Sequence, residues 1–381
     1  MSTRNLIFAI AAALALTFTV CDNGITDQTD LIVTWPADLT ASRGQKLADI
    51  SLAAYTNDNT GTFAWDSPDH PAGASFGAHP HSMTFTPNDR SKYNAIKKNV
   101  NVRVSLAEMV RITGGTYTMG SPPNEQYREN NEAQVNALID DFYLGKYEVT
   151  QAQWYEIMET TIEDQQALAD IASSADYGRG DNRPIYYVSW YDALVFCNRL
   201  SALEGLTPAY RIDDETDPDW WGDIPTEYKA EWSAVEIVAG SNGYRLPDEA
   251  QWEYACRAGT TTPWYSGETD ENLGDYAWYV QNNGRSGTPE YGAKPVGAKK
   301  PNDFGLYDMH GNVCEWCWDR CGIYPVLSDP LGVWITGNNF RMIRGNSWNY
   351  PARYQRSAFR DFHNQFSRNF RTGFRLMRPA E

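Results

Sequence analysis

The chain has 381 residues, of which 42% are hydrophobic and 13% aromatic, and its formal net charge is −17 at pH 7. This length and apolar content allow two or three folded domains and exclude a disordered chain. The negative charge argues against general nucleic-acid binding, which needs a cationic surface to displace counterions.

The chain begins with a predicted targeting segment at residues 1–21. Arg4 precedes an apolar run, Leu6 to Val20, which is too short for a secure membrane span. The run ends at Cys21 and resembles a bacterial lipoprotein signal peptide, in which Cys21 carries the lipid. The alternative is an ordinary signal peptide that leaves Cys21 unmodified. We therefore expect a bacterial cell-envelope protein, an outer-membrane or cell-surface lipoprotein held to the membrane by its N-terminal lipid.

Residues 22–30 are polar and predict a linker, and residues 31–105 predict a small β-sandwich-like module. Val100, Val102, Val104 and Leu106 alternate along one strand face. The module is loosely similar to immunoglobulin-like spacers of bacteria. Its strand-like runs are Leu31 to Trp35, Thr62 to Trp65, Met83 to Thr86 and Asn99 to Leu106. The pair His79 and His81 could bind a metal, although a His-x-His sequence in a loop is usually incidental.

A second domain is expected from residue 108 to 381, with three predicted helices. Thr150 and Gln153 form a capping-box pattern, and Ser189 opens a second helix. Pro247 suits the first turn of the third helix, and Gly259 its end. Between the last two helices lies an acidic stretch, residues 213–223, whose spacing fits no EF-hand loop, so we interpret it as a solvated insertion.

Five motifs then occur in a fixed order over roughly 270 residues. They are Met109 to Gly120, Tyr147 to Trp154, Tyr244 to Ala255, Gly305 to Trp316, and a closing Arg344-Gly345-x-Ser347-Trp348 with Gly373-Phe374-Arg375. Together they resemble the formylglycine-generating enzyme or sulfatase-modifying factor family. The resemblance implies an α+β fold, a C-type-lectin-like domain of the formylglycine-generating-enzyme type, preceded here by the small all-β immunoglobulin-like module.

The resemblance also argues against an enzyme. In the family's enzymes, two copper-binding cysteines follow the Gly-Gly-Ser segment, five positions apart. The corresponding positions here hold Tyr350 and Gln355, and no cysteine follows Cys321. Copper(I) needs soft thiolate ligands, which a phenol and an amide cannot replace.

The family's calcium site is matched by Asp308, Gly311, Val313 and Glu315. Two carboxylates with two backbone carbonyls between them suit a hard cation, so a structural calcium ion is possible although no cofactor is required. The alternative is that Asp308 and Glu315 only brace loops through hydrogen bonds.

Five cysteines remain after Cys21, and their state is left open. With His310, three of them have a spacing that could hold zinc, whereas export favours disulfides and helical spacing favours buried thiols. The five are Cys197, Cys256, Cys314, Cys317 and Cys321.

The C-terminal segment 344–376 has an unusual composition. From Asn349 to Arg371 it contains no Lys, Glu, Met, Ile, Leu or Val, which is not typical of a packed core. Variable proteins of diversity-generating retroelements are altered only at adenines, and such changes in Asn codons never produce Lys, Glu, Gln, Met or Trp. Apart from Gln355 and Gln365, the window obeys this restriction. It therefore resembles the variable surface lipoproteins of spirochaetes, although drift of a dead enzyme domain is the alternative.

We therefore predict a non-catalytic, surface-anchored receptor or adhesin whose C-terminal segment binds an unknown protein or glycan ligand, with no nucleic-acid partner. Arg344, Arg356, Arg360 and Arg375 are expected to pair with acidic residues and hold a constant frame. The rivals are an oxidase of the formylglycine-generating type and a degenerate, purely structural envelope protein. The predicted contact residues combine aromatic and short polar side chains, as antibody loops do: Tyr350, Tyr354, Phe359, Asp361, Phe362, His363, Asn364, Phe366, Asn369 and Phe370.

Overall fold

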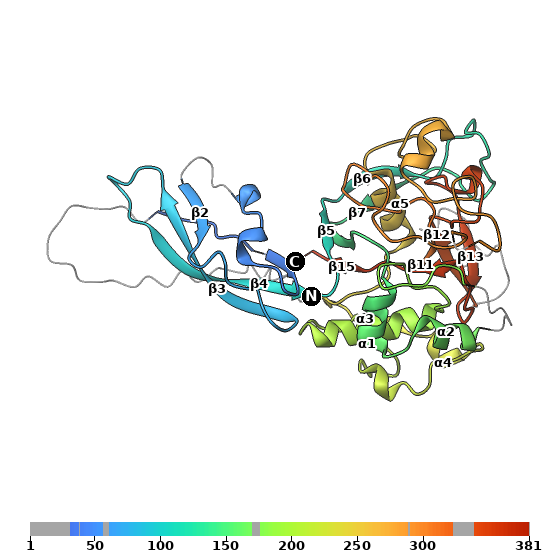
Figure 1. The fold of residues 1–381 in the computed structure, drawn as a ribbon, viewed down its shortest axis with the longest axis horizontal. Helices are drawn as coiled ribbons and strands as arrows, with labels where there is room; N and C mark the ends of the chain where they lie inside the picture. Colours follow the sequence, from blue (N-terminus) through green and yellow to red (C-terminus); the bar gives the residue numbers. More distant parts are fainter. Residues whose placement is uncertain are drawn as a thin grey trace, which may run out of the picture.

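The computed structural model describes residues 31–37, 39–55, 61–169, 176–288, 290–322 and 339–380. The chain forms two parts, a narrow one that holds the strands before Leu106 and a larger one that holds all the helices labelled α1 to α5 (Figure 1). Cys21 and the predicted linker lie outside the described residues, so lipidation of Cys21 stays a prediction. No helix among the described residues is long and apolar enough to cross a membrane.

The narrow part contains one four-stranded sheet in the order β1-β4-β3-β2. β1 runs parallel to β4, and the other two pairs are antiparallel. In the described residues this differs from the two facing sheets of the predicted sandwich. The bounds are β1 Leu39–Ser42, β2 Gly61–Trp65, β3 Gly77–Pro87 and β4 Ile96–Ser105, with 3-10 turns η1 Leu47–Asp49 and η2 Ala53–Tyr55.

The predicted alternation in β4 is confirmed, because Val100, Val102 and Val104 are buried. Leu47 and Ala72, which lie outside the strands, are buried in the same cluster. An alternating strand shows which face is buried but not what covers it, and this is why a sandwich could not be distinguished from a sheet covered by turns. The run Leu31 to Trp35 forms no strand.

One place where the two parts meet is Glu204, the C-cap residue of α3 (Trp190–Leu203). Its backbone oxygen accepts a hydrogen bond from Arg103 Nη1 at 2.7 Å, and its Oε1 accepts one from the Leu106 backbone N–H at 2.7 Å. Its Oε2 accepts from the Tyr244 hydroxyl at 2.8 Å. A buried carboxylate that accepts hydrogen bonds from both parts fixes how the short connection between β4 and β5 (Met109–Ile112) leaves the narrow part.

The helices of the larger part begin where local sequence predicts them. Thr150 and Ser189 each form a capping box, and the capped helices pack against each other through a stacked Trp154–Phe196 pair at 5.7 Å. The third predicted helix is capped by Asp248 rather than opened by Pro247, and the left-handed residue at its end is Ala258. The helices are α1 Gln151–Met158, α2 Ile162–Leu168, α3 Trp190–Leu203, α4 Ala230–Ser233 and α5 Glu249–Arg257.

Short strands surround these helices and place the C-terminal segment. β11 and β12 pair antiparallel, β13 adds to the outer side of β12, and β14 adds parallel to β11. The order is therefore β13-β12-β11-β14, and all four strands lie within residues 314–373. The bounds are β11 Cys314–Arg320, β12 Phe340–Arg344, β13 Asp361–Asn364 and β14 Thr372–Gly373.

The remaining strands tie the two ends of the domain together. The final strand pairs with β8, which also pairs with the first strand of the domain, in the order β15-β8-β5. The acidic stretch 213–223 between β9 and β10 is mostly exposed, as predicted for a solvated insertion. The bounds are β5 Met109–Ile112, β6 Gly115–Met119, β7 Val135–Ile139, β8 Phe142–Gly145, β9 Tyr210–Arg211, β10 Glu236–Ile237 and β15 Met377–Pro379; the 3-10 turns are η3 Pro218–Trp220, η4 Asp270–Asp275 and η5 Ala352–Tyr354.

Candidate ligand-binding surface

Five arginines of the C-terminal segment are buried, and each forms an ion pair with a carboxylate from another part of the chain. We call them the arginine frame. Their N–O distances lie between 2.6 and 2.9 Å. The pairs are Arg344 with Glu249 and Glu253, Arg356 with Glu125 and Glu132, Arg360 with Glu249, Arg368 with Asp192, and Arg375 with Glu315.

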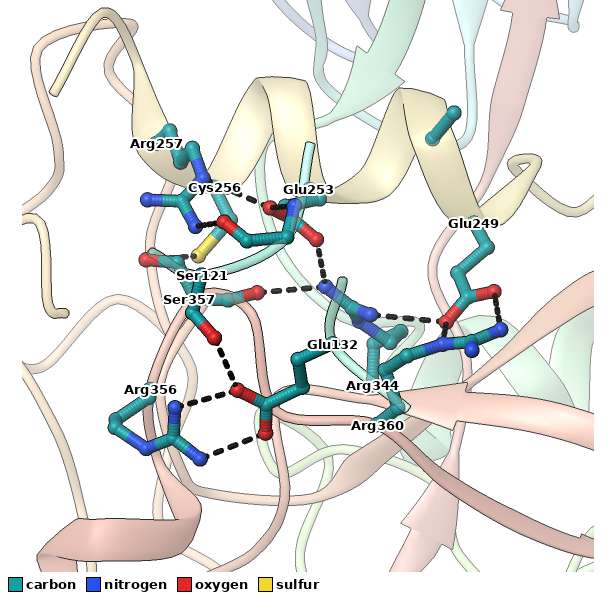
Figure 2. Close-up of polar contacts among 12 residues, drawn as sticks. Ser121, Glu132, Glu249, Glu253, Cys256, Arg257, Arg344, Arg356, Ser357 and Arg360 are labelled. Atoms are coloured by element: carbon teal, nitrogen blue, oxygen red, sulfur yellow. Dashed lines mark hydrogen bonds and ion pairs between the residues drawn. The ribbon is translucent and has the colours of Figure 1, made fainter. Parts of the chain in front are cut away.

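Helix α5 supplies the centre of this frame, as Figure 2 shows. Glu249 accepts two hydrogen bonds from Arg360, both at 2.7 Å, and a third from Arg344 at 2.9 Å. Burial alone would raise the pKa of Glu249, but the two guanidinium groups outweigh burial and hold that pKa below its usual value. Glu253, one turn later on the same helix face, accepts from Arg344 at 2.6 Å. The predicted pairing of frame arginines with acidic residues is confirmed.

The predicted contact residues lie between these anchors, and nine of the ten are half-buried. They are therefore neither packed into the core nor free in solvent. The exception is Phe359, which is 8% exposed and lies in the interior. Because its side chain is buried, its placement among the contact residues is not supported. The sequence could not show this, since a segment without aliphatic residues has no periodicity that tells an inward-pointing ring from an outward-pointing one.

The two glutamines that break the compositional restriction are both fully buried. Gln355 donates to the Ser347 backbone oxygen at 3.0 Å, and Gln365 accepts from Arg341 at 3.3 Å. The backbone oxygen of Gln365 also accepts from the Trp190 N–H at 3.0 Å. The exceptions to the restricted composition are thus structural residues and do not lie on the surface.

Several contact residues are brought together around Arg371. The rings of Tyr350 and Tyr354 meet edge to face at 5.6 Å, and the guanidinium of Arg371 lies over the rings of Tyr350 and Phe370, at 4.8 and 5.2 Å. Phe370 stacks on Tyr177 at 4.5 Å. Tyr177 was missed by sequence reasoning, because it stands alone, far from the C-terminal segment.

Strand β13 divides the remaining contact residues between two faces. Asp361 and His363 lie on the side of Cys314 and Trp316, and the rings of His363 and Trp316 are 6.1 Å apart. Phe362 lies on the opposite side, against Phe340. The structure therefore groups Asp361 and His363 with the arginine-centred cluster, and separates Phe362 and Asn364 from it.

We define the C-terminal surface as the half-buried contact residues that lie around Arg371 or on the Cys314 side of β13. Arg353 and Arg371, which contact these residues, are included. Burial, aided by Arg371, lowers the pKa of His363 to about 4, and burial raises the pKa of Asp361. The ring of His363 is therefore neutral at physiological pH. The members are Tyr350, Arg353, Tyr354, Asp361, His363, Asn369, Phe370 and Arg371.

No thiol occupies the positions expected for redox cysteines. The Gln355 amide lies 3.4 Å from the Tyr350 backbone oxygen, and the Tyr350 hydroxyl accepts from Arg371 at 2.5 Å. Cys314 is buried nearby, and burial raises the pKa of its thiol to about 12. A thiol of that kind is a poor nucleophile and a poor metal ligand, because the thiolate performs both roles.

The five described cysteines are all free thiols, so of the three states left open by the sequence the structure has no disulfide among them. His310 lies against Cys256 at 3.8 Å and stacks on Tyr265, and burial lowers its pKa to about 3. The described residues contain no group of three His, Cys, Asp or Glu side chains placed to hold a metal ion. Neither a zinc site at His310 nor one at His79 and His81 is supported; these last two rings bond to backbone oxygens.

The residues of the expected calcium site fit a hard cation in part. Asp308 Oδ1 is buried and accepts no hydrogen bond from the described residues, and burial raises the pKa of Asp308 to about 6. Both oxygens of Glu315 accept from Arg375, at 2.6 and 2.7 Å. Glu148 contributes a third carboxylate to this region, and burial and then Asp308 raise its pKa. Asp308 is therefore the residue that a cation would satisfy, whereas Glu315 already has a cationic partner.

Comparisons with known proteins match the larger part of the chain. The profile of a family described as sulfatase-modifying factor enzyme 1-like domain matches residues 94–380. A protein of Paenibacillus barcinonensis named chaperone protein LppX is 36% identical over 253 residues, which cover 63% of this chain and 78% of that protein. The formylglycine-generating enzyme of Mus musculus is 26% identical over 310 residues, covering 67% of this chain and 71% of that enzyme.

A solved structure is also similar to this one. Treponema denticola variable protein 1 superposes with a TM-score of 0.59 at 28% identity, over 79% of this chain and 100% of that one. Enzymes and a variable protein thus share this fold, so the fold alone does not decide the function.

Proposed function

Because the chain belongs to the family of sulfatase-modifying factor enzyme 1-like domains, we propose that it is a non-catalytic binding protein whose C-terminal surface holds a ligand. The predicted family and α+β fold class are confirmed. The similarity to Treponema denticola variable protein 1 supports a variable binding segment over an active site.

The observation that carries the proposal is the division of labour within the C-terminal segment. Every frame arginine is buried against a carboxylate outside the segment, whereas Tyr350, Tyr354 and Phe370 are half-buried. Large rings and short polar groups on a rigid support give much contact area at small entropic cost. The burial of Gln355 and Gln365 supports the same division, because only residues outside the surface escape the compositional restriction.

Binding can be tested with full-length protein and a triple variant, Y350A/Y354A/F370A. Fluorescently labelled protein is added to a panel of bacterial and animal cells, and binding is measured by flow cytometry. We expect the variant to lose cell binding while its melting temperature falls by only a few degrees, since half-buried rings contribute less than core residues.

The matched control is Y155A, which removes a large exposed ring from α1, outside the C-terminal surface. It should bind as the wild type does. Unchanged binding by the triple variant, or a collapse of its melting temperature, would refute the proposal.

A separate genetic observation tests sequence diversification. We expect the flanking DNA to contain a near-repeat of the last coding segment that differs only at adenines, beside a reverse transcriptase gene.

The absence of a thiol at positions 350 and 355 supports a binding role over oxidation of a sulfatase cysteine. The direct test incubates the protein with copper, reductant, oxygen and a cysteine-containing sulfatase peptide. Mass spectrometry should find the peptide unchanged. Conversion of its cysteine to formylglycine would show that the protein is an oxidase of the formylglycine-generating type.

A protein ligand receives separate support from the Paenibacillus relative that is named a chaperone. Binding of unfolded clients is therefore a second candidate. It predicts that the protein slows the aggregation of a heated client in light-scattering experiments, and that the triple variant does not.

We also propose that the protein is held in the cell envelope through a lipid on Cys21, in agreement with the relative named LppX. Metabolic labelling with an alkyne fatty acid should label the wild type and leave C21S unlabelled.

Calcium is proposed at Asp308, with backbone oxygens of Gly311 and Val313. Added calcium should raise the melting temperature of the wild type more than that of D308N, and magnesium should raise neither.

A further inference from the structure

Two arginines of the C-terminal surface have no carboxylate partner among the described residues. Arg353 and Arg371 form no ion pair within the part of the chain that the structure describes, although the five frame arginines of the same segment all do. The chain carries an excess of acidic residues, with a formal charge of −17, so the lack of a partner is not a shortage of carboxylates.

Arg371 is held in place without being neutralised. Its Nη1 donates to the Tyr350 hydroxyl at 2.5 Å, and its Nε donates to Asn369 Oδ1 at 3.3 Å. The rings of Tyr350 and Phe370 lie beside its guanidinium plane. These contacts fix the direction of the Arg371 guanidinium. They do not use its Nη2, for which the described residues provide no acceptor.

Arg353 extends the same cation-bearing area toward solvent. It is exposed, its guanidinium lies 4.6 Å from the Tyr354 ring centre, and its Nη2 donates to the Tyr354 hydroxyl at 3.1 Å. Tyr354 in turn meets Tyr350 edge to face. The two unpaired guanidinium groups are thus linked by two tyrosines.

The other polar groups around Arg371 do not replace a counter-ion. Asp361 acts on Arg371 electrostatically, but it is not ion-paired and its Oδ1 accepts from the Phe362 N–H at 2.8 Å. His363 and the Cys314 thiol face the same group and are neutral, since burial and Arg371 lower the pKa of His363 and burial raises that of Cys314. A half-buried guanidinium that is held in position without an ion-pair partner has the geometry to bind an anion.

We propose that the C-terminal surface binds an acidic peptide segment. Arg371 donates hydrogen bonds to a carboxylate of the ligand, and Arg353 provides a second cationic contact. This inference rests on the proposed binding function. A carboxylate can accept from the free edge of Arg371 while apolar neighbours in the peptide contact Tyr350 and Phe370. A peptide is favoured over an acidic glycan because Asn369 and Asp361 already have partners, leaving few groups for sugar hydroxyls.

The test measures fluorescence anisotropy with full-length protein and two labelled peptides. One alternates aspartate with phenylalanine, and the other has asparagine in place of each aspartate. We expect the wild type to bind the aspartate peptide about tenfold more tightly, as a charge-assisted hydrogen bond should give. R371Q should lose this preference, and R371K should keep part of it because it retains the charge but not the planar fork.

The matched control is R90Q, which removes the same charge from an exposed position in the narrow part of the molecule and should keep the preference. Circular dichroism of each variant checks that it is folded. Equal binding of the two peptides by the wild type, binding of neither, or a preference that survives in R371Q would overturn the acidic-peptide inference.

The outcomes also separate this inference from the proposed function. Cell binding that depends on Tyr350 and Tyr354 but not on Arg371 would leave the binding function standing and remove the acidic ligand. Displacement of the labelled peptide by sialyllactose, at concentrations where lactose has no effect, would assign the surface to acidic glycans instead.

Discussion

Replacing Arg344 with methionine should be among the most destabilising substitutions in the chain. Arg344 is 1% exposed and donates to Glu249 at 2.9 Å, to Glu253 at 2.6 Å and to the Ser357 backbone oxygen at 2.6 Å. Methionine fills a similar volume, so the loss reports the polar contacts and only a small cavity. The Ser357 contact also ties the frame to the turn that follows η5.

The expected loss is about 4 kcal/mol of unfolding free energy. Removing one partner of a buried ion pair costs about 3–5 kcal/mol, because a charge is left buried and unpaired. The two carboxylates keep partial compensation here: Glu249 retains Arg360, and Glu253 retains Arg257. The Ser357 oxygen adds about 1–3 kcal/mol if it is left without a donor. These opposing contributions place the value near the middle of the range.

Urea unfolding followed by tryptophan fluorescence measures the loss, with R344M/E253Q as the double variant. Removing both charges should cost less than the sum of the two single changes, because E253Q takes away the carboxylate that R344M leaves unpaired. The control is R43M, which breaks the exposed Arg43–Glu156 pair and should cost within about 1 kcal/mol. A loss below about 1 kcal/mol for R344M, with an unchanged m-value, would refute the reasoning.

Three further changes test other parts of the structure. F359A should lose about 3 kcal/mol in urea unfolding, as a core ring does, whereas N364A, which changes a half-buried polar residue of β13, should lose less than about 1 kcal/mol. Burial, with Asp248 and Glu249, raises the pKa of Asp319 from 3.8 to about 7. A raised folded pKa gives stability that is fully present below about pH 4 and is lost as the pH rises to about 7, and a pKa difference of about three corresponds to a decline of at most about 4 kcal/mol. D319N should remove this decline, measured as the free energy of unfolding at pH 4 and pH 8. Y350C/Q355C should bind about one copper(I) ion in a chelator competition while the wild type binds none there, because the double variant supplies two thiolates at positions where the side chain of residue 355 lies near the backbone of residue 350.

Local signals in the sequence were the most dependable. Thr150 and Ser189 cap the helices they were expected to cap, because a capping box is complete within four residues. The start of α5 differs slightly: Asp248 caps it, and Pro247 lies before the cap. Helix ends depend on competition between neighbouring caps, so they are placed less securely than the helix itself.

Long-range partners could not be predicted individually. Arg356 pairs with Glu132, which lies 224 residues earlier, and nothing in either local sequence specifies the other. Four arginines of the C-terminal segment were expected to pair with acidic residues, but only the fold shows which carboxylate pairs with which arginine. Phe359 was misplaced for the same reason: in a segment without aliphatic residues, no periodicity distinguishes an inward ring from an outward one.

The junction at Glu204 has a mechanical consequence. The narrow part and β13 lie toward opposite ends of the molecule (Figure 1), and the connection between β4 and β5 is only three residues long. A pull between β13 and β2 therefore passes through this connection, which Glu204 clamps by its backbone oxygen and both carboxylate oxygens. The exposed Arg43–Glu156 pair also joins the two parts. Under tension, this ion pair and the hydrogen bonds of Glu204 with Arg103 and Leu106 must break before the two parts can swing about the connection, so these contacts together set the force that the junction withstands.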